Sequence, residues 1–326
     1  RQRQMCIRDR VERMEKKKKG YLTLKESRRI IKYNIRQMKF YEKQKKKKLP
    51  LSAYTATMKN ADNVIEIDNL QTCFFTDTGT VKSVNGVSFN IPKNKIVGVV
   101  GESGCGKSVT SLSIMQLVQA PQGQITGGSI RFNTDELGFD SSGNKLAYDI
   151  AKMPMKQMYN VRGKDITMIF QEPMTSLNPV FTIGYQLDEV MFVHYPRTTK
   201  EKAKEHSIEL LNQVGISMPE RVYKSYPHEL SGGMRQRVMI AMALAGNPKL
   251  IIADEPTTAL DVTIQAQILE LLKEIQKKTG CSIMLITHDL GVIAEMADEV
   301  VVMYAGRVIE KGTVREIFNH PLHPYT

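Results

Sequence analysis

The chain has 326 residues, of which 41% are hydrophobic and 25% are charged, and it has no Trp. This length can bury a substantial core, and the composition is that of an ordinary globular protein. The formal charge of +12 is concentrated in residues 1–57, which hold 20 Lys and Arg against 5 Asp and Glu; residues 58–326 carry a net charge of −3. Because this body is mildly acidic, it lacks the basic surface that binding to nucleic-acid phosphates requires.

Cysteine spacing and apolar runs exclude further classes of protein. The most apolar stretch, residues 238–253, is interrupted by Asn247, Pro248 and Lys249 and falls short of the roughly 18 to 20 apolar residues of a membrane helix. No signal-peptide pattern is found, so we expect a cytoplasmic protein. The four cysteines lack CxxC spacing, which argues against a zinc site or a disulfide framework: Cys6, Cys73, Cys105 and Cys281.

The basic segment, residues 1–57, differs from the rest of the chain. Its lysine runs at 16–19 and 45–48 are typical of a disordered, solvated tail, with contact to a membrane surface or an acidic partner as the alternative. A third interpretation is that the segment is not native, because its first ten residues resemble sequencing-adapter read-through and Met58 precedes the first strand-like segment. We expect the folded domain to occupy residues 58–326.

From Asn63 onward the pattern changes to short β-rich segments. We predict strands at 64–67 and 87–91 in an antiparallel lobe. The continuous apolar run at 95–100 predicts a strand buried on both faces, and residues 108–118 predict a helix.

Two further buried strands are predicted at 250–253 and 282–286, and each is followed directly by polar residues. In a parallel α/β sheet, ligands bind at the carboxyl ends of strands, so these ends and that of 95–100 can form one site. Residues from about 150 to 245 are Met-rich and mostly helical, and they predict a second subdomain.

A glycine-rich sequence follows strand 95–100 and matches GxxxxGK[ST], the pattern of a phosphate loop. Its glycines let backbone N–H groups turn around phosphate oxygens, Lys107 supplies a charge for the β- and γ-phosphates, and Ser108 supplies a hydroxyl for Mg²⁺. About one chain in a hundred of this length would match by chance, so the motif alone is not decisive. The predicted ATP contacts in this loop are Gly101, Ser103, Gly104, Cys105, Gly106, Lys107 and Ser108.

Cys105 lies inside this loop, next to a predicted helix N-terminus. Such a position can lower the pKa of a thiol. We therefore expect maleimide to inactivate the protein and ATP to protect it.

Two carboxylates follow strand 250–253. In isolation, Asp254 and Glu255 would be interpreted as a solvent-facing strand end. After a phosphate loop, we predict that Asp254 binds the metal and that Glu255 orients or polarises the water that attacks the γ-phosphate. Phosphoryl transfer requires mainly positioning and charge neutralisation, which these residues supply.

The sequence LSGGMRQR at residues 230–237 opens a long apolar helix. On its own, Ser231 is an ordinary N-cap. Together with the phosphate loop, the ADEP sequence at 253–256 and a His after the next strand, it resembles the ATPase domain of ABC transporters, over residues 64–326. This resemblance implies an α/β P-loop NTPase fold with an antiparallel β lobe and a helical subdomain, and hydrolysis of ATP with Mg²⁺.

The resemblance also implies roles for single residues. Gln171 would contact Mg²⁺ and lie at the permease interface, and His288 would contact the γ-phosphate; unaided, they would be interpreted as a surface residue and a structural strand-end residue. Phe74 would stack on adenine, with Phe75 as the alternative and a core position as the unassisted interpretation. The resemblance assigns catalysis to Glu255, His288 and Lys107, metal contacts to Ser108, Gln171 and Asp254, a further ATP contact to Val109, and contacts to ATP of a partner subunit to Ser231, Gly232, Gly233 and Asp261.

The implied partners are a second ABC ATPase subunit, identical or homologous, two membrane permease subunits and, indirectly, a solute-binding protein. The two ATPase subunits would form a closed head-to-tail dimer with two nucleotides, at the cytoplasmic face of the membrane. No nucleic-acid partner is expected.

Four sequences are similar to the oligopeptide/dipeptide importer branch of the family: FQEPMTSLNP at 170–179, YPHE at 226–229, DVTIQAQ at 261–267 and HPYT at 323–326. We therefore predict peptide import, although related systems import nickel, glutathione or antimicrobial peptides. Branch members continue beyond HPYT, often into a cysteine-containing extension, which we expect to be missing here. The stretch 133–160 is longer than usual and has no predicted function.

Two rival interpretations lead to other functions. A soluble ABC ATPase acting on nucleic acid or ribosomes would usually carry tandem ATPase domains or long coiled coils, and this sequence has neither. A catalytically silent member of a heterodimer is disfavoured because its catalytic residues would be altered, whereas they are intact here: Lys107, Gln171, Asp254, Glu255 and His288.

Overall fold

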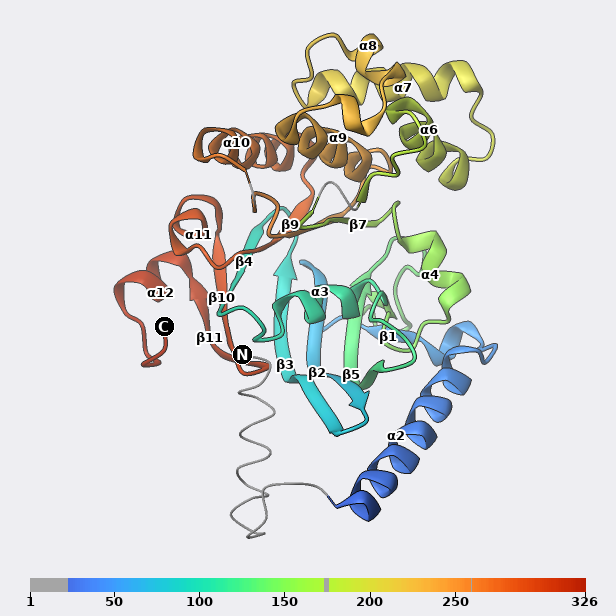
Figure 1. Ribbon diagram of the computed structural model, residues 1–326, viewed down its shortest axis with the longest axis vertical. Coiled ribbons are helices and arrows are strands. Elements are labelled where there is room, and N and C mark those ends of the chain that lie inside the picture. The colour runs from blue at the N-terminus through green and yellow to red at the C-terminus, as the bar shows by residue number, and fades with distance from the viewer. Residues whose placement is uncertain (1–22, 173–175, 259) are drawn as a thin grey trace. The chain divides into compact units, whose positions relative to one another are not determined.

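The computed structural model describes residues 23–172, 176–258 and 260–326 (Figure 1). The lysine run at 16–19, Pro173–Thr175 of the importer-like sequence and Ala259 lie outside these ranges. The chain divides into two compact units. The first comprises residues 23–90, 99–158 and 300–326 of the described chain, and the second comprises residues 91–98 and 159–299.

An antiparallel sheet forms most of the first unit. It buries large side chains such as Ile65, Phe89 and Phe132, each less than 2% exposed. The predicted strands at 64–67 and 87–91 fall within β2 and β3, which are longer than predicted. In spatial order the strands are β1 (Thr55–Thr57), β6 (Leu146–Asp149), β5 (Gly123–Asn133), β2 (Asn63–Thr76) and β3 (Gly79–Pro92).

The phosphate-loop sequence leads into helix α3 (Lys107–Ile114), which is shorter than the predicted helix at 108–118. The helix ends because Gln116 takes a left-handed backbone conformation, with φ of 50°. The side-chain amide of Gln116 donates hydrogen bonds to the carbonyl oxygens of Ile150 and Met153, which fixes this turn. The unit also contains strand β11 (Arg307–Thr313), helix α12 (Val314–Asn319) and most of β10 (Glu299–Tyr304).

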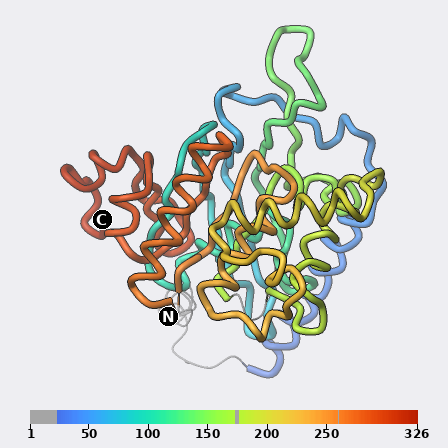
Figure 2. The backbone as a smooth tube through the Cα atoms, turned by 90° about the horizontal axis from the view of Figure 1, so that it is seen from above, coloured from blue at the N-terminus to red at the C-terminus, as the bar shows by residue number. Residues whose placement is uncertain are grey.

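Residues 133–160, noted above for their length, begin with a loop that projects from the sheet, drawn in green in Figure 2. A β-bridge joins Phe139 to Lys145. The Asp140 carboxylate accepts hydrogen bonds from the backbone N–H groups of Ser142 and Asn144, both at 2.8 Å. The segment continues through β6 into helix α4 (Met155–Val161).

The interpretation of residues 1–57 as a disordered tail is wrong for its described part. Residues 24–45 form helix α2 (Leu24–Lys45), which packs against β2 and β5, and 3₁₀ turn η1 (Leu51–Ala53) and β1 follow it. The prediction from the high content of Lys and Arg overlooked a stripe of uncharged residues at helical spacing that faces the sheet. This stripe includes Ile30, Asn34 and Tyr41. Burial of this stripe stabilises the helix against the sheet.

Parallel strands form the core of the second unit. Strand β4 (Ile96–Val100) begins here and ends in the first unit. Its neighbours follow in the order β9 (Ser282–Ile286), β8 (Leu250–Asp254) and β7 (Ile166–Ile169). All five residues of β8 and of β9 are buried, which confirms the prediction from their continuous apolar runs. The parallel pairing of Asp254 with Ile286 places the carboxyl ends of β8 and β9 at one edge.

The helical part of the second unit lies within the predicted subdomain range. Figure 1 shows its helices gathered in one group. The Asp188 carboxylate ties three of them together, because it accepts hydrogen bonds from Ser207 Oγ at 2.6 Å and from the Tyr223 hydroxyl at 2.5 Å. The three helices that Asp188 joins are α6 (Ile183–His194), α7 (Lys200–Gln213) and α8 (Pro219–Lys224). The 3₁₀ turn η2 (Pro227–Glu229) and helix α9 (Gly232–Leu244) follow them.

Helices α10 (Val262–Thr279) and α11 (Leu290–Met296) complete the second unit. Helix α10 follows β8, and α11 follows β9, so each predicted strand end leads through a short connection into a helix. Within the described ranges, no helix combines the length and hydropathy that a bilayer crossing demands.

Candidate functional site

The phosphate-loop sequence forms a tight turn in the first unit. Lys107 is buried, and its ammonium group donates hydrogen bonds to the carbonyl oxygens of Gly101 at 2.7 Å and Glu102 at 3.1 Å. Gly106 is the N-cap of α3, and Ser108 and Val109 lie in the first turn of that helix. The lysine charge and the positive helix N-terminus therefore meet in one loop, the arrangement that binds phosphate oxygens.

Two glycines are sterically required in this loop. Gly101 has φ of 151° and Gly106 has φ of 105°, a range that favours glycine. A Cβ atom on Gly101 would collide with the carbonyl oxygen of Met303, and one on Gly106 would collide with that of Ser83. Because both obstacles are backbone atoms, the loop has no room for side chains at these positions.

The expectation of a reactive Cys105 thiol is wrong. Cys105 is only 5% exposed, and burial raises the pKa of its thiol above the ordinary value of 9.0. The nearby Lys107 charge acts in the opposite direction but is the smaller effect. Desolvation of the thiolate outweighs the helix N-terminus on which the sequence interpretation relied.

The structure distinguishes the two candidate aromatics on β2. Phe75 is buried at 5% exposure, and its ring stacks with that of Tyr41 from α2 at a centroid distance of 6.1 Å. Phe74 is only half-buried. Since Phe75 is part of the core beneath α2, Phe74 is the aromatic with a ring surface left for a ligand.

In the second unit, the Glu255 carboxylate gathers polar side chains from three connections. Gln171 Nε2 donates a hydrogen bond to Glu255 Oε2 at 3.0 Å, and Thr258 Oγ1 donates to the same oxygen at 3.1 Å. His288 Nδ1 lies 3.4 Å from the other oxygen, Oε1. The side chain of Glu255 is 16% exposed and that of His288 is 65% exposed, so the cluster opens to solvent on the histidine side.

The backbone at Glu255 is also unusual. Its φ of 48° lies in the left-handed region, which costs a residue with a side chain about 1 kcal/mol or more. Its N–H donates a hydrogen bond to the carbonyl oxygen of Ile286 at the end of β9, 2.9 Å away. This turn places the carboxylate just beyond the end of β8, where Gln171 and His288 reach it.

The residues predicted to hold Mg²⁺ offer the oxygen ligands that this ion prefers: a hydroxyl, an amide oxygen and a carboxylate from Ser108, Gln171 and Asp254. Asp254 is the last residue of β8 and is only 6% exposed. Gln171 uses its amide nitrogen on Glu255, so its amide oxygen faces away from that bond. This donor set is chemically suited to Mg²⁺.

The LSGG turn is exposed in the second unit. Ser231 is the N-cap of α9, and its hydroxyl accepts a hydrogen bond from the N–H of Met234 at 3.4 Å. Ser231 and Gly232 are exposed, and a Cβ on Gly233 would lie 2.9 Å from Ile264 of α10. The glycine thus allows α9 to approach α10 closely.

Asp261 is also exposed and is the N-cap of α10, but its side chain makes no capping hydrogen bond. A Cβ on Gly232 would lie 3.7 Å from the side chain of Leu260, so the LSGG turn lies beside the residue that precedes Asp261. The second unit therefore presents Ser231, Gly232 and Asp261 on its surface.

The predicted site residues divide between the units. The first unit holds Phe74 and residues 101–109, which include Lys107. The second unit holds the LSGG turn and four further predicted residues: Gln171, Asp254, Glu255 and His288. Sequence reasoning missed Thr258 as a partner of Glu255. Its only signal was a hydroxyl three residues after the carboxylate.

The model of a family described as ABC transporter matches residues 84–258. The oligopeptide transport ATP-binding protein OppD of Bacillus subtilis is 54% identical over 263 residues, which are 81% of this chain and 70% of that protein. The dipeptide transport ATP-binding protein DppD of the same organism is 52% identical over 265 residues, 81% of this chain and 75% of that protein.

Solved structures agree with this result. The dimeric ATP-binding cassette MJ0796, in a post-hydrolysis state bound to ADP and Pi, matches with a TM-score of 0.63 at 25% identity, over 77% of this chain and 99% of that one. CbiO1 from Clostridium perfringens, part of the ABC transporter complex CbiONQ, matches with a TM-score of 0.62 at 26% identity, over 79% of this chain and 92% of that one. With a matching family model and relatives of more than 50% identity, this chain belongs to the ABC transporter family.

Proposed function

We propose that the chain is the ATP-binding and ATP-hydrolysing subunit that energises a membrane permease for the import of peptides. The observation that carries this proposal is the Glu255 carboxylate, fixed by Gln171 and Thr258 and lying beside His288. A carboxylate positioned in this way can orient a water molecule for attack on a phosphate.

Each part of the site has a role in this proposal. The phosphate-loop amides and Lys107 bind the β- and γ-phosphates, Phe74 stacks on adenine, and His288 contacts the γ-phosphate. Glu255 accepts a proton from the attacking water or orients it. Ser108, Gln171 and Asp254 would hold Mg²⁺, which when bound neutralises charge on the phosphates.

The exposed surface of the second unit supports a second ATPase subunit. Ser231, Gly232 and Asp261 are exposed, and Asp261 has no capping role. The cassette MJ0796, which this chain resembles, is dimeric. We propose that these residues contact ATP bound by the partner subunit, so that isolated monomers hydrolyse ATP poorly.

Exposed apolar side chains support a membrane permease as the other partner. They follow Gln171 in the chain and include Val180, which is 72% exposed, and the stacked pair Phe181 and Tyr185, whose ring centroids are 4.5 Å apart. Exposed apolar patches are typical of protein interfaces. Two permease subunits would bind here at the cytoplasmic face of the membrane, and a solute-binding protein would deliver the cargo to them.

The names of the similar proteins support peptides as the cargo, since OppD and DppD are oligopeptide and dipeptide transport proteins. Reconstitution of the chain with its permeases in vesicles would test this directly. ATP-dependent uptake of a labelled oligopeptide is the expected result. Uptake of nickel without uptake of peptide, or co-purification of the chain with ribosomes or DNA, would contradict the proposal.

Substitution of the carboxylate tests the hydrolytic role. We expect Glu255→Gln to retain ATP binding, to lower kcat about 1,000-fold and to accumulate a closed dimer, because the proton acceptor is lost while the phosphate loop is intact. Glu270→Gln is the matched control, because Glu270 is an exposed residue of α10 away from the cluster. Normal turnover by Glu255→Gln would remove Glu255 from the mechanism.

A further inference from the structure

Helix α2 carries a positively charged surface. Seven of its eight Lys and Arg residues are exposed. Six of them recur every three or four residues and so follow one face of the helix, here named the basic face: Lys25, Arg29, Lys32, Arg36, Lys39 and Lys43. The helix has 22 residues and is therefore about 33 Å long.

The opposite face of α2 is fastened to the first unit, which fixes the direction of the basic face. Asn34 is 3% exposed, and its amide donates hydrogen bonds to the carbonyl oxygens of Thr76 at 2.7 Å and Gly79 at 3.1 Å. Tyr41 stacks on Phe75 one turn before the helix ends. Because these contacts hold the inward side, the basic residues point away from the sheet; Figure 1 shows α2 as a straight helix at the margin of this unit.

The two acidic residues of α2 serve other contacts. Glu26 completes a capping box with Thr23 at the start of the helix. Glu42 accepts a hydrogen bond from Gln124 of β5 at 2.8 Å. Both side chains are half-buried, whereas the six residues of the basic face are exposed. The basic face therefore carries no acidic side chain of its own helix.

We propose that the basic face of α2 binds the anionic surface of a phospholipid bilayer. Each Lys or Arg near such a surface is attracted to it, and a straight row of them can touch a flat surface at once. Two exposed aromatics border the row, Tyr33 at 58% and Phe40 at 53% exposure, and aromatic side chains favour the bilayer interface.

The charge of residues 58–326 favours a bilayer over a nucleic acid. These residues carry a net charge of −3, so a flexible polyanion that extended from α2 onto them would meet an acidic body. A bilayer touched by the helix alone avoids this repulsion. The inference rests on α2 and does not depend on the proposed function.

Sedimentation of the full chain with vesicles tests the proposal. We expect the chain to bind vesicles that contain phosphatidylglycerol but not vesicles of phosphatidylcholine alone. Removing four charges with Lys32→Gln, Arg36→Gln, Lys39→Gln and Lys43→Gln should weaken binding about 100-fold or more, at several-fold per charge. Gln has a helix propensity similar to that of Lys and Arg, so α2 is expected to remain helical, which circular dichroism checks.

The matched control removes the same number of charges from other helices: Lys200→Gln, Lys202→Gln, Lys277→Gln and Lys278→Gln, all at exposed positions of α7 and α10. It should bind the anionic vesicles as the parent chain does. Equal losses in both variants would overturn the proposal, because general charge would then explain binding.

A salt titration of the unchanged chain gives a test that needs no variant. Binding to the anionic vesicles should fall steeply as salt rises, since screening shortens electrostatic attraction. Three outcomes would each overturn the proposal. They are binding that does not change with salt concentration, equal binding to both vesicle types, and binding to single-stranded RNA without binding to anionic vesicles.

Discussion

The hydroxyl of Tyr325 accepts a hydrogen bond from the backbone N–H of Glu102, at a distance of 2.8 Å. Glu102 is the second residue of the phosphate loop, and Tyr325 belongs to the HPYT sequence. The other end of this sequence is held by Glu310 of β11, whose carboxylate accepts a hydrogen bond from the N–H of His323 at 3.1 Å. The HPYT sequence therefore bridges β11 and the phosphate loop within the first unit.

Removing this hydroxyl should loosen the phosphate loop. We expect Tyr325→Phe to raise the Kd for ATP about fivefold, the effect of one lost hydrogen bond of about 1 kcal/mol. Tyr304→Phe is the matched control, because the centroid of the Tyr304 ring lies 4.8 Å from that of Tyr325 but, within the described residues, Tyr304 makes no hydrogen bond with Glu102. Calorimetric titration with ATP measures both, and equal affinities would show that the bond has no role in binding.

Thr258 should act through Glu255. Thr258→Val removes the hydroxyl that donates to Glu255 Oε2 but preserves the shape of the side chain. We expect kcat to fall about fivefold with an unchanged Kd for ATP, because one of the hydrogen bonds that orient the carboxylate is lost. In a Glu255→Gln background the same change should have little further effect on kcat, and an additive loss would contradict this coupling.

The Cys105 thiol should react slowly at neutral pH. Burial raises its pKa above 9.0, so the thiolate is scarce at pH 7, and its amount grows about tenfold for each unit of pH until the raised pKa is reached. We expect maleimide labelling of this residue to follow that rise. A Cys105→Ser variant lacks this thiol, so the labelling that it loses relative to the unchanged chain is the labelling of Cys105. Rapid labelling of Cys105 at pH 7 would contradict the effect of burial.

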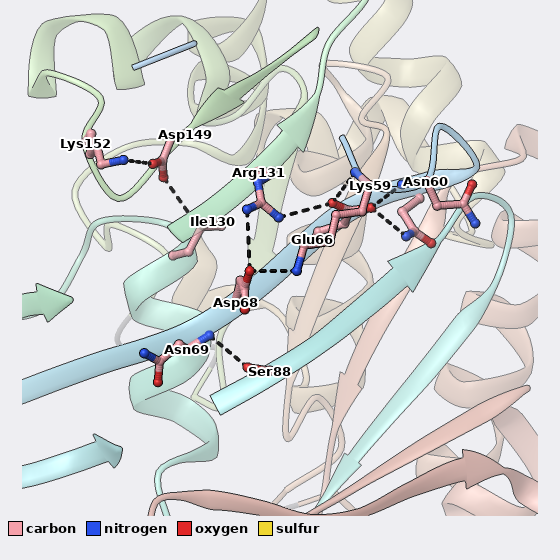
Figure 3. Close-up of polar contacts among 11 residues, drawn as sticks. Lys59, Asn60, Glu66, Asp68, Asn69, Ser88, Ile130, Arg131, Asp149 and Lys152 are labelled. Carbon is pink, nitrogen blue, oxygen red and sulfur yellow. Dashed lines mark hydrogen bonds and ion pairs between the residues drawn. The ribbon is translucent and has the colours of Figure 1, made fainter. Parts of the chain in front are cut away.

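Glu66 anchors a polar network in the antiparallel sheet, which Figure 3 shows. It is 1% exposed, and its carboxylate accepts hydrogen bonds from the N–H groups of Lys59 at 2.9 Å and Asn60 at 2.7 Å. Arg131 Nη1 lies 3.5 Å from Glu66 Oε2. The carboxylate thus neutralises a guanidinium and receives two backbone donors.

We expect Glu66→Gln to lower the free energy of unfolding by about 3 kcal/mol, because an amide removes the charge beside Arg131 and turns one acceptor into a donor. Urea denaturation measures the loss. Asp77→Asn is a control of the same chemistry at an exposed position between β2 and β3. If both variants unfold at the same urea concentration, the network does not stabilise the sheet.

The sequence predicts the second unit's strands well because β8 and β9 are buried on both faces, so burial leaves a continuous apolar run. Gln171 and His288 each contact Glu255, while the roles that the family resemblance implies for these residues stay predictions. Helix α2 was missed because its lysines dominate the composition, although the inward stripe containing Asn34 has helical spacing.

Side-chain environments were less predictable. A helix N-terminus lowers the pKa of a thiol that is accessible to solvent, but Cys105 is buried. Its burial depends on residues distant in the chain, which a local sequence pattern does not reveal. The hydrogen bond between Tyr325 and Glu102 joins positions 223 residues apart, and no local sequence pattern predicts it. Such contacts arise from the packing of the whole unit.

Asn34 fastens α2 to the turn between β2 and β3, and Phe74 precedes that turn by only two residues on β2. A displacement of α2 would therefore act directly on this hairpin, and only a short stretch of β2 separates the hairpin turn from Phe74.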